Sequence, residues 1–466
     1  MESKKTCIAM VPSPGLSHLI PLVEFAKLLL QQHNDYQITF LIPTLGPLNP
    51  SMKTILNTLP PNMDFIVLPQ INIEDLPETH EPATQMKLIV KHSVPFLQEA
   101  VKSLISKTNL VALVFSMFST DAHDVAKQFN LLSYLFYASG AVLFSFFLTF
   151  PNLDEAASTQ FLESSYKTVN VPGVSDPYHV TELPDPFLCE RSSDTYKSIL
   201  DVCQKLSLFD GVIINTFTDL EPDAVRVLQE RQKPCVYPVG PIIRNESNSE
   251  ANMSVSLRWL EKQPPNSVVF VSFGSGGTLS HEQLNELAFG LEMSGHKFLW
   301  VVRVPSKHSS SAYFSGQKDD PLEYLPNGFL ERTKEKGLVV TSWAPQVEIL
   351  GHGSTGGFLS HCGWSSTLES VVNGVPVIAW PLFAEQKMNA KLLTDVLKVA
   401  VRPKIDDENG IVKREEVAKA IKRIMEGDES FVIRKRIEEL RDGAANALSE
   451  NGSSRKALSD LALKWH

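Results

Sequence analysis

The sequence predicts an α/β protein of two domains, each built on a doubly wound parallel sheet. Short β-branched or apolar runs alternate with helical patterns through most of the chain, which is the pattern of parallel sheets covered by helices. At 466 residues, the chain also exceeds what one hydrophobic core normally serves. We therefore expect two facing domains, with ligands bound at the carboxyl ends of strands and in a cleft between the domains.

The predicted strands fall into two sets, separated by a polar stretch without periodicity that follows Gly240 and Pro241. The strands of the first set are Cys7–Val11, Ile38–Ile42, Phe65–Leu68, Val111–Phe115 and Ser133–Tyr137, and those of the second set are Val268–Phe273, Phe298–Val302, Val339–Trp343, Gly357–Ser360 and Val375–Trp380. Because each set can form its own sheet, we interpret the polar stretch as an interdomain linker.

These boundaries divide the chain into a first domain (1–240), a linker (241–255) and a second domain (256–450). The final helical segment, 451–466, is expected to pack back on the first domain. Residues 305–321 form an irregular stretch inside the second domain, for which a surface loop and a lid over the cleft are both open.

Composition narrows the class of protein. The formal net charge is −10, and no run of like charges or basic patch suggests a nucleic-acid partner. The five cysteines are widely spaced and include no Cys-x-x-Cys pair, so reduced thiols in the cytoplasm fit best. The N-terminus lacks a signal-peptide pattern, and the longest apolar run, Ala141–Phe150, is about half of what a membrane-spanning helix needs. We expect a cytoplasmic protein without a membrane-inserted segment.

Three strands of the second domain end in polar or aromatic residues that should meet at one edge of its sheet. The first runs into a glycine-rich turn that contains Ser275. Glycines let backbone N–H groups approach an anion closely, and Ser275 adds a hydroxyl donor. Many strand–helix turns carry glycine for geometry alone, so this turn by itself is weak evidence. Ser280 and Gln283 predict a capping box at the start of the next helix.

The second strand end is followed by His361 and by a helix that starts near Trp364. The free N–H groups and the dipole of a helix N-terminus favour a phosphate, and His361, Ser365 and Ser366 offer further donors. A diphosphate can be bound in this way without lysine or arginine. Glu369, one turn after Ser365, presents a carboxylate that suits ribose hydroxyls. For an isolated histidine, a core or capping role would be the alternative.

The third strand leads to Glu385 and Gln386, which can bond adjacent hydroxyls of a sugar. An ordinary helix start is the alternative, because glutamate is common near helix N-termini. Trp343 closes a neighbouring predicted strand and can stack on a flat base, although tryptophan is more often found in cores. In the first domain, His18 follows the first strand, where helix capping and catalysis are both open, and Asp121 follows the strand Val111–Phe115.

With these residues in place, the chain resembles the plant family 1 UDP-dependent glycosyltransferases of secondary metabolism. The span from Trp343 to Gln386 has the 44-residue length of their signature. The matching residues are Trp343-Ala-Pro-Gln, His361-Cys-Gly-Trp-Ser-Ser, Leu368-Glu-Ser, Pro376, Trp380-Pro and Glu385-Gln. The similarity extends through nearly the whole chain, and the stretch Phe270–Arg303 looks like the hydroquinone and phenylpropanoid glucosyltransferase branch.

The resemblance implies the GT-B fold, in which two Rossmann-like domains face each other, and it implies roles for a set of donor-site residues. Uracil would stack on Trp343, base and ribose would contact Ala344, Gln346 and Glu369, the diphosphate would contact Ser275, His361, Ser365 and Ser366, and the sugar would contact Trp364, Glu385 and Gln386. Ser365 departs from the asparagine that is common in the family, so its phosphate contact is expected to be shorter or bridged by water. Glutamine at position 386 indicates glucose.

The resemblance also implies that His18 is the catalytic base and Asp121 its partner. A carboxylate bonded to the imidazole fixes its tautomer and supports the charge gained with a proton. The expected reaction transfers glucose from UDP-glucose to a hydroxyl of a small phenolic, phenylpropanoid or flavonoid acceptor, by a single displacement that gives a β-glucoside. Fixed dipoles would stabilise the leaving diphosphate. No Asp-x-Asp motif is present, so no metal or other cofactor is expected.

The acceptor pocket is the least readable part of the site. Phe118, Phe144, Phe147 and Phe187 are candidates for its lining, with core packing as the alternative. The identity of the acceptor, the hydroxyl used, attack by nitrogen or carbon, and strictness for glucose are not readable from the sequence. A monomer is favoured by the resemblance alone.

Two other functions stay open: a UDP-sugar hydrolase or epimerase of the same fold, and a non-catalytic protein that binds a sugar nucleotide or a phenol. A nicotinamide dehydrogenase is set aside. The stretch Gly351–Gly356 has the spacing of a dinucleotide fingerprint, but it precedes a strand instead of linking a strand to a helix.

Overall fold

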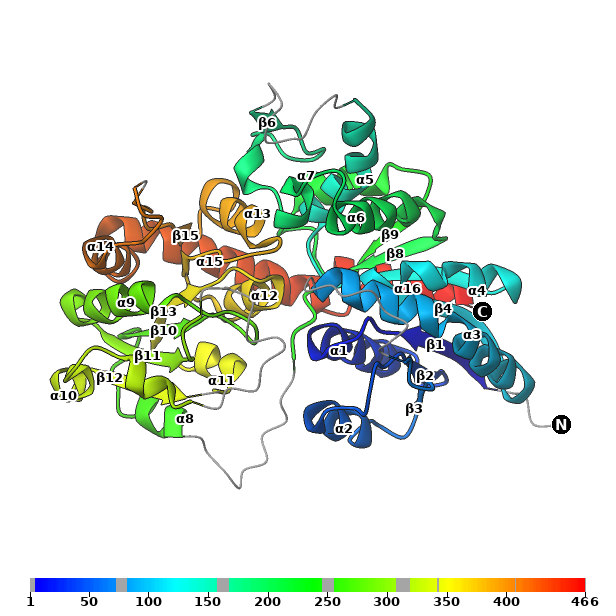
Figure 1. Ribbon diagram of the computed structural model, residues 1–466, viewed down its shortest axis with the longest axis horizontal. Coiled ribbons are helices and arrows are strands. Elements are labelled where there is room, and N and C mark those ends of the chain that lie inside the picture. Colours follow the sequence, from blue (N-terminus) through cyan, green and yellow to red (C-terminus); the bar gives the residue numbers. More distant parts are fainter. Residues whose placement is uncertain are drawn as a thin grey trace. The chain divides into compact units, whose positions relative to one another are not determined.

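Figure 1 shows a computed structural model of the chain, which describes residues 5–72, 82–156, 167–244, 255–306, 319–341, 343–406 and 408–465. The chain divides into two compact units. The first unit comprises Met1–Thr181, Pro186–Arg244 and Asn446–His466, and the second comprises Glu182–Asp185 and Asn245–Ala445. Each unit has a parallel sheet of its own.

The first unit is built on a seven-stranded sheet with the order β3-β2-β1-β4-β5-β8-β9, in which all neighbours pair in parallel. Its strands are β1 (Thr6–Val11), β2 (Gln37–Ile42), β3 (Met63–Val67), β4 (Asn109–Ser116), β5 (Leu132–Tyr137), β8 (Gly211–Ile214) and β9 (Cys235–Pro238). The central strands are buried along nearly their whole length, because helices cover both faces of a parallel sheet. A small antiparallel pair, β6 (Thr168–Val169) and β7 (Tyr178–His179), is also present.

The helices of the first unit connect these strands. They are α1 (Leu16–Gln32), α2 (Pro50–Asn57), α3 (Pro82–Lys107), α4 (His123–Gln128), α5 (Ala141–Ala156), α6 (Asp194–Lys205), α7 (Pro222–Gln229) and α16 (Ser453–Ala462), with the 3₁₀ turns η2 (Met117–Ala122) and η9 (Leu463–Trp465). Side-chain caps start two of them: Asn49 accepts from the Met52 backbone N–H, and Ser193 accepts from that of Tyr196.

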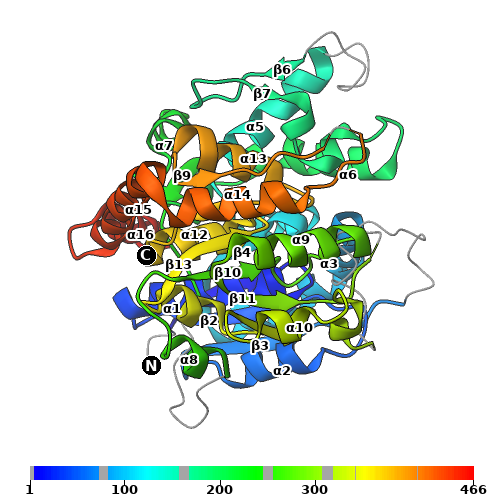
Figure 2. The same cartoon turned by 90° about the vertical axis from the view of Figure 1, so that its left-hand side faces the viewer.

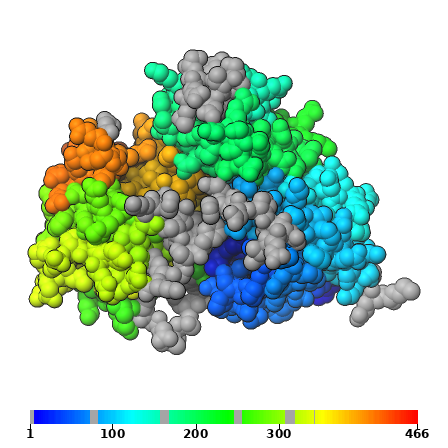
Figure 3. All heavy atoms as spheres, viewed as in Figure 1, coloured from blue at the N-terminus to red at the C-terminus, as the bar shows by residue number. Residues whose placement is uncertain are grey.

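The second unit contains a six-stranded parallel sheet with the order β12-β11-β10-β13-β14-β15. The strands are β10 (Val268–Ser272), β11 (Lys297–Val302), β12 (Gly337–Thr341), β13 (Thr355–Ser360), β14 (Val377–Ala379) and β15 (Ala400–Val401), and the helices are α8 (Val255–Leu260), α9 (His281–Ser294), α10 (Phe329–Thr333), α11 (Gln346–Gly351), α12 (Trp364–Asn373), α13 (Gln386–Lys391), α14 (Arg414–Met425) and α15 (Gly427–Leu448). Two hydrophobic clusters, one on each face, cover this sheet. Helices α9 and α14 pack side by side, as Figure 2 shows, and their surfaces adjoin in Figure 3.

The predicted α/β class with two parallel-sheet domains is confirmed. All ten predicted strands are present, although β12 ends at Thr341, so that Trp343 lies in the following loop. Ser280 caps α9 as expected by accepting from the Gln283 N–H at 3.2 Å, but the Gln283 side chain bonds Val412 in both directions and does not complete a capping box. The sequence therefore predicted the helix start correctly and the reciprocal bond incorrectly.

The segment Asn446–His466 belongs to the first unit. Tyr36 donates a hydrogen bond to the Ala462 carbonyl at 3.1 Å, and Ser454 donates one to the Gly240 carbonyl at 2.6 Å. The sequence analysis placed the start of this segment at residue 451, and it did not anticipate that Glu182–Asp185 groups with the second unit. Residues 245–254 of the linker and 307–318 of the irregular stretch lie outside the described residues.

All five cysteines lie in the described part of the chain, and none of them forms a disulfide. Within that part, no helix combines the length and the apolar character that crossing a bilayer requires.

Candidate functional site

Four neighbouring strands of the second unit place their carboxyl ends at one edge of the sheet. In the order β11-β10-β13-β14, they lead to Arg303, to the turn with Ser275, to His361 and to the loop before Gln386. Parallel pairing runs through all four strands. Because carboxyl ends of parallel strands share an edge, the residues predicted from three separate motifs are brought to one place.

His361 lies between two glycine backbones. A Cβ added to Gly274, whose φ is +73°, would lie 2.6 Å from the ring, and one added to Gly363 would lie 2.5 Å from Nε2. The Nδ1 atom is buried and has no hydrogen-bond partner among the described residues. Burial, with a smaller contribution from Arg303, lowers the pKa of His361 to about 4. The ring is therefore neutral near pH 7, with one nitrogen unpaired, which suits a hydrogen bond to a ligand.

The start of α12 lies next to His361. Gly363 is its N-cap residue and makes no side-chain cap, and the first turn contains no acidic residue. The Glu385 carboxyl group, from the loop before α13, accepts a hydrogen bond from the Trp364 backbone N–H. The anion site at this helix start therefore consists of the following backbone N–H groups and the helix dipole. Ser365 is exposed in the first turn, whereas Ser366 and the indole of Trp364 are buried.

Gln346, at the first position of α11, links this region to the side chains expected to contact ribose. Its Nε2 donates to Ser366 Oγ at 2.8 Å and to Glu369 Oε2 at 2.6 Å. The two acceptors lie one turn apart on α12, so the bonds fix the rotamers of all three residues. The structure thus brings Gln346, Ser366 and Glu369 together, as the sequence motifs suggest.

Among the tryptophans that the sequence analysis names, Trp343 is the most exposed in the described part of the chain, with 60% of its surface accessible. An exposed indole at a strand end has a free face for stacking, whereas a core tryptophan does not. Ala344, the next residue, is buried at 7% and packs in a hydrophobic cluster with Ile349. Ala344 is therefore a core residue, whereas Trp343 is not.

The loop before α13 carries the residues expected to bind the sugar. The Gln386 amide oxygen accepts from the Leu382 and Phe383 backbone N–H groups at 2.8 and 3.1 Å. This oxygen is already used by the loop, so the amide N–H₂ group is the part of Gln386 left to contact a ligand. Glu385 is half-buried at the N-cap of α13, and burial raises its pKa.

Asp185, from the short segment that groups with this unit, braces the same loop. Its Oδ2 accepts from the Ala384 N–H at 3.1 Å, and its Oδ1 accepts from Lys387 Nζ at 2.8 Å. Ala384 has a φ of +54°, which an L residue adopts only at a cost. The sequence gave no indication of this brace, because the partners lie about 200 positions apart.

Arg303 is a candidate that the sequence analysis missed. Its guanidinium donates to the Ser275 carbonyl at 2.9 Å and contributes to the low pKa of His361, and burial lowers its own pKa. It follows β11 directly, at the same edge as the other candidates. The strand-end argument used for the three motifs would have found it, had it been applied to the strand Phe298–Val302.

In the first unit, His18 lies in the first turn of α1, three residues after the N-cap residue Gly15. Its ring meets that of Phe118 edge to face, with 5.4 Å between the centroids. Ser13 Oγ accepts from the Phe118 backbone N–H at 3.0 Å and so ties the loop before α1 to η2. Burial lowers the pKa of His18 to about 4, so the imidazole is neutral and able to accept a proton near pH 7.

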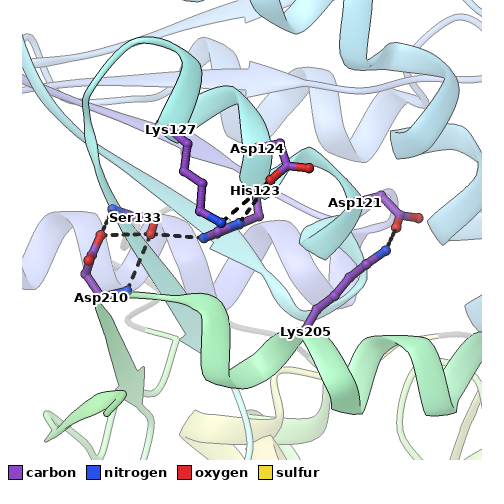
Figure 4. Close-up of polar contacts among 7 residues, drawn as sticks. All are labelled: Asp121, His123, Asp124, Lys127, Ser133, Lys205 and Asp210. Atoms are coloured by element: carbon purple, nitrogen blue, oxygen red, sulfur yellow. Dashed lines mark hydrogen bonds and ion pairs between the residues drawn. The ribbon is translucent and has the colours of Figure 1, made fainter. Parts of the chain in front are cut away.

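Asp121 lies on η2 and is paired with lysine instead of histidine. Figure 4 shows its carboxylate bonded to Lys205. The expected hydrogen bond between His18 and Asp121 is not formed in the described part of the chain. The sequence motif could not indicate this, because the lysine belongs to α6, far from either residue in the sequence.

The four phenylalanines divide into two groups. Phe144, Phe147 and Phe187 are buried: Phe187 lies 4.9 to 5.0 Å from the rings of Phe146 and Phe147, and Phe144 lies 5.0 Å from the ring of Tyr137. Core packing, the alternative weighed for them, fits this burial. Phe118 is half-buried and contacts His18, so it is the one of the four with surface beside the candidate base.

Comparisons with known proteins give the family. A profile described as "UDP-glucoronosyl and UDP-glucosyl transferase" matches residues 249–434. The hydroquinone glucosyltransferase of Rauvolfia serpentina is 51% identical over 462 residues, covering 98% of this chain and 97% of the relative. The solved structure of Phytolacca americana UGT2 complexed with UDP-2fluoro-glucose and pterostilbene is 44% identical, with a TM-score of 0.89 and 99% of each chain covered.

A second solved structure is similar over a comparable length. It is the complex between 3,4-dichloroaniline and a UDP-glucosyltransferase from Polygonum tinctorium capable of glucosylating indoxyl, which is 44% identical, with a TM-score of 0.91 and coverage of 100% of this chain and 99% of that chain. Fold and similarity together define a GT-B glycosyltransferase that uses UDP-sugars in plant secondary metabolism. The chain belongs to the plant UDP-glycosyltransferase family.

Proposed function

We propose that the protein transfers glucose from UDP-glucose to a hydroxyl of a small phenolic, phenylpropanoid or flavonoid acceptor and forms a β-glucoside. The observation that carries the donor half is the unpaired Nδ1 of His361 beside the N-terminus of α12. A phenolic acceptor is supported by two similar proteins: one is a hydroquinone glucosyltransferase, and the solved structure of the other contains pterostilbene. Glucose is supported by these relatives and by glutamine at position 386.

The donor would be held by groups that differ in chemistry along its length. Uracil stacks on the exposed face of Trp343, with base and ribose against the Ala344 backbone and Gln346. The ribose hydroxyls bond Glu369, whose carboxylate is already oriented by Gln346. In this structure the Gln346 amide donates to both Ser366 and Glu369. On binding, the ribose hydroxyls would replace these hydrogen bonds or add to them.

The diphosphate would lie at the start of α12, where it accepts from backbone N–H groups, His361, Ser366 and Ser275. Ser365 has a shorter side chain than the asparagine common in the family, so a water molecule between it and the phosphate is part of the proposal. Preorganised dipoles of this kind stabilise the charge that develops on the leaving UDP. They also make a metal ion unnecessary, so we propose a metal-independent reaction.

The chemical step is a single displacement. The acceptor O–H gives its proton to His18, the oxygen forms a bond to C1 of glucose, and the bond from C1 to the β-phosphate oxygen breaks with its electron pair leaving on UDP. Attack from the face opposite to UDP inverts the configuration from α to β. Trp364, Glu385 and the Gln386 N–H₂ group would orient the sugar for this attack.

The proposal also includes a cytosolic location and a monomeric state. Five unbridged cysteines suit the reducing cytosol, and the family resemblance favours a monomer. Light scattering of the purified protein and fractionation of plant cells test these two points directly.

The function is tested by incubating the protein with UDP-glucose, EDTA and hydroquinone, coniferyl alcohol or a flavonol, and by following UDP and glucoside. We expect acceptor-dependent UDP release and a β-glucoside. The variant His18→Ala should lose about 100- to 10,000-fold in kcat, the contribution typical of general-base catalysis. His92→Ala, an exposed histidine of the same unit, is the matched control and should match the wild type.

Each alternative function has its own result in this experiment. Equal UDP release with and without acceptor would establish a hydrolase, and conversion of the donor to another UDP-sugar would establish an epimerase. Binding of UDP-glucose without turnover over the whole panel would establish a non-catalytic binding protein. Inhibition of transfer by EDTA would contradict the metal-independent part of the proposal.

A further inference from the structure

Asp121 belongs to a cluster of four charged side chains, with Lys87, Asp201 and Lys205. The Asp121 carboxylate is 7% exposed, with Oδ1 bonded to Lys205 Nζ and Oδ2 3.6 Å from Lys87 Nζ. Asp201 accepts from both lysines, at 2.8 Å from Lys205. The members come from three elements, α3, η2 and α6, so the cluster exists only in the folded first unit.

The turn η2 connects this cluster to His18. Residues three positions apart project from the same side of a 3₁₀ helix, so Phe118 and Asp121 share a side of η2. The Phe118 ring contacts the His18 ring, and the Phe118 N–H is bonded to Ser13 in the loop before α1. The turn η2 thus links the cluster, through Asp121, to the candidate base, through Phe118.

The cluster is balanced in charge, because two lysines face two aspartates. On α4, which also packs against η2, His123 contacts Asp124 at 3.7 Å and Ser133 at 3.3 Å, and Lys127 contacts Asp124. Lys91 and His92 on α3 and Lys197 on α6 are exposed to solvent. In the described part of the chain, Lys87 and Lys205 are therefore the cations paired with Asp121. A balanced cluster passes little net field to His18, whereas a change of one charge within it would be felt there.

We propose that Lys205, supported by Lys87 and Asp201, is a positioning residue for catalysis that holds Asp121 as a carboxylate and sets how much of its negative charge reaches His18. The role rests on the proposed function, in which His18 is the base. The positive charge of Lys205 offsets the negative charge of Asp121 that would otherwise act on His18. Asp201, which also pairs with Lys205, reduces the positive charge that Asp121 experiences.

The sign of the effect follows from charge balance. Lys205→Gln leaves a net negative charge near His18, which favours the imidazolium and moves the acid limb of kcat/KM to higher pH. Asp201→Asn leaves a net positive charge, which moves the limb to lower pH and reduces kcat near pH 7, because the imidazolium formed during transfer is less stabilised. Each shift should be on the order of 0.5 to 1 pH unit.

The test compares kcat/KM for the acceptor, at saturating UDP-glucose, from about pH 3 to about pH 9 in five variants. Lys205→Gln and Asp201→Asn change the charge in opposite directions, and Lys205→Arg restores it. Lys197→Gln on α6 and Lys91→Gln on α3 are exposed controls from the same two helices. In parallel, the His18 imidazole is titrated by NMR in histidine-labelled protein, with its signal assigned from His18→Ala, so that one readout does not need turnover.

Opposite shifts in the two charge variants, with Lys205→Arg and both controls following the wild type, would support the role. Equal losses of kcat in Lys205→Gln and Asp201→Asn without a shift of the limb or of the NMR titration would show a merely structural cluster and overturn it. If the wild type transfers glucose and His18→Ala does not, but the titrations stay unchanged, only this inference fails. If the wild type makes no glucoside, the proposed function fails, and this role falls with it.

Discussion

At the scale of single residues, the position of His361 depends on two neighbouring glycines, Gly274 and Gly363, whose lack of a side chain leaves room for the ring. Gly363 has φ −61° and ψ 146°, a conformation open to any residue, so its glycine is not required by the backbone. It is required by space, because an added Cβ would lie 2.5 Å from His361 Nε2. We predict that Gly363→Ala displaces the ring and lowers kcat/KM for UDP-glucose by about 10- to 100-fold, the range expected for a misplacement near 1 Å.

Gly353→Ala is the matched control for this prediction. Gly353 lies in the turn before β13, and a Cβ there meets nothing within 4 Å. Steady-state kinetics with varied UDP-glucose and circular dichroism of both variants make the comparison. A Gly363→Ala enzyme with the kinetics of Gly353→Ala would show that the ring has room to move and does not need its observed place.

Residue types and spacing identified most of the candidate donor site, because strand ends of one parallel sheet meet at one edge whatever the rest of the fold does. His361, Ser366 and Glu369 were found in this way. The lysines around Asp121 could not be found, since α3 and α6 approach η2 only through tertiary packing. The motif around Asp121 gives its place on the chain, but the partner of its carboxylate is decided by helices elsewhere.

At the scale of secondary-structure elements, the contact between α9 and α14 contains an ion pair that also caps a helix. Glu286 on α9 accepts from the Arg414 backbone N–H at 2.7 Å, at the first position of α14, and pairs with the Arg414 guanidinium. The same guanidinium lies 4.2 Å from the centre of the Phe289 ring. The hydrogen bond from Arg414 is the main cause that lowers the pKa of Glu286. Glu286 therefore connects the two helices and satisfies an N–H group at a helix start.

We predict that Glu286→Gln lowers the free energy of unfolding by about 1 to 2 kcal/mol at pH 7, since a cap is lost and the ion pair is partly solvent-screened. A carboxyl whose pKa is depressed by folding contributes its stability above the unfolded pKa and loses it as pH falls through the folded pKa. The gap between wild type and variant should thus close in acid. Urea unfolding at pH 7 and at about pH 3 measures both effects.

Glu429→Gln is the control, because its ion pair with Arg423 is exposed on both sides and should contribute about 0 to 1 kcal/mol. A loss in Glu286→Gln that persists unchanged at low pH would contradict the electrostatic origin. Packing of the neutral amide, which has the same length as the carboxylate, would then be the cause.

The sequence predicted the strands and helices whose hydrophobic pattern is long, and it did not predict several strands that are short. β8, β9 and β15 were not predicted: the first two have four residues each, and β15 has two. Runs this short show no measurable alternation, and pairing with an already formed sheet decides that they are strands. For the same reason β12 is shorter than its apolar pattern, which continues to Trp343, whereas the ladder with β11 ends at Thr341.

At the scale of the whole molecule, the two units do not follow the order of the chain. Glu182–Asp185 groups with the second unit, although the residues on both sides belong to the first. Glu182 lies near Lys391 and Arg402, and Asp185 pairs with Lys387. This exchange of four residues depends on charges that are scattered along the sequence. Prediction from the sequence could place the return of the C-terminal segment, which is helical and apolar on one side, but not this exchange.

The C-terminal segment completes the core of the first unit through Trp465. The indole is 1% exposed and lies 5.4 Å from the ring of Tyr134 and 6.3 Å from that of Tyr36. We predict that Trp465→Ala destabilises the first unit by about 3 to 5 kcal/mol, the usual cost of truncating a buried aromatic side chain. The neighbouring Leu463 is 69% exposed on the same turn, so Leu463→Ala should be close to neutral.

Hydrogen exchange measured by mass spectrometry can locate this loss, because it reports local unfolding free energies segment by segment. Trp465→Ala should reduce the protection of β1, β4 and β5, whose residues share a hydrophobic cluster with the indole, while β10 and β13 keep theirs. UDP, which the proposal assigns to the second unit, should raise the protection of β13 and α12 in wild type and variant alike. Equal loss in both units would mean that they unfold as one cooperative body, and the last residues of the chain would then stabilise the whole enzyme instead of the unit that contains them.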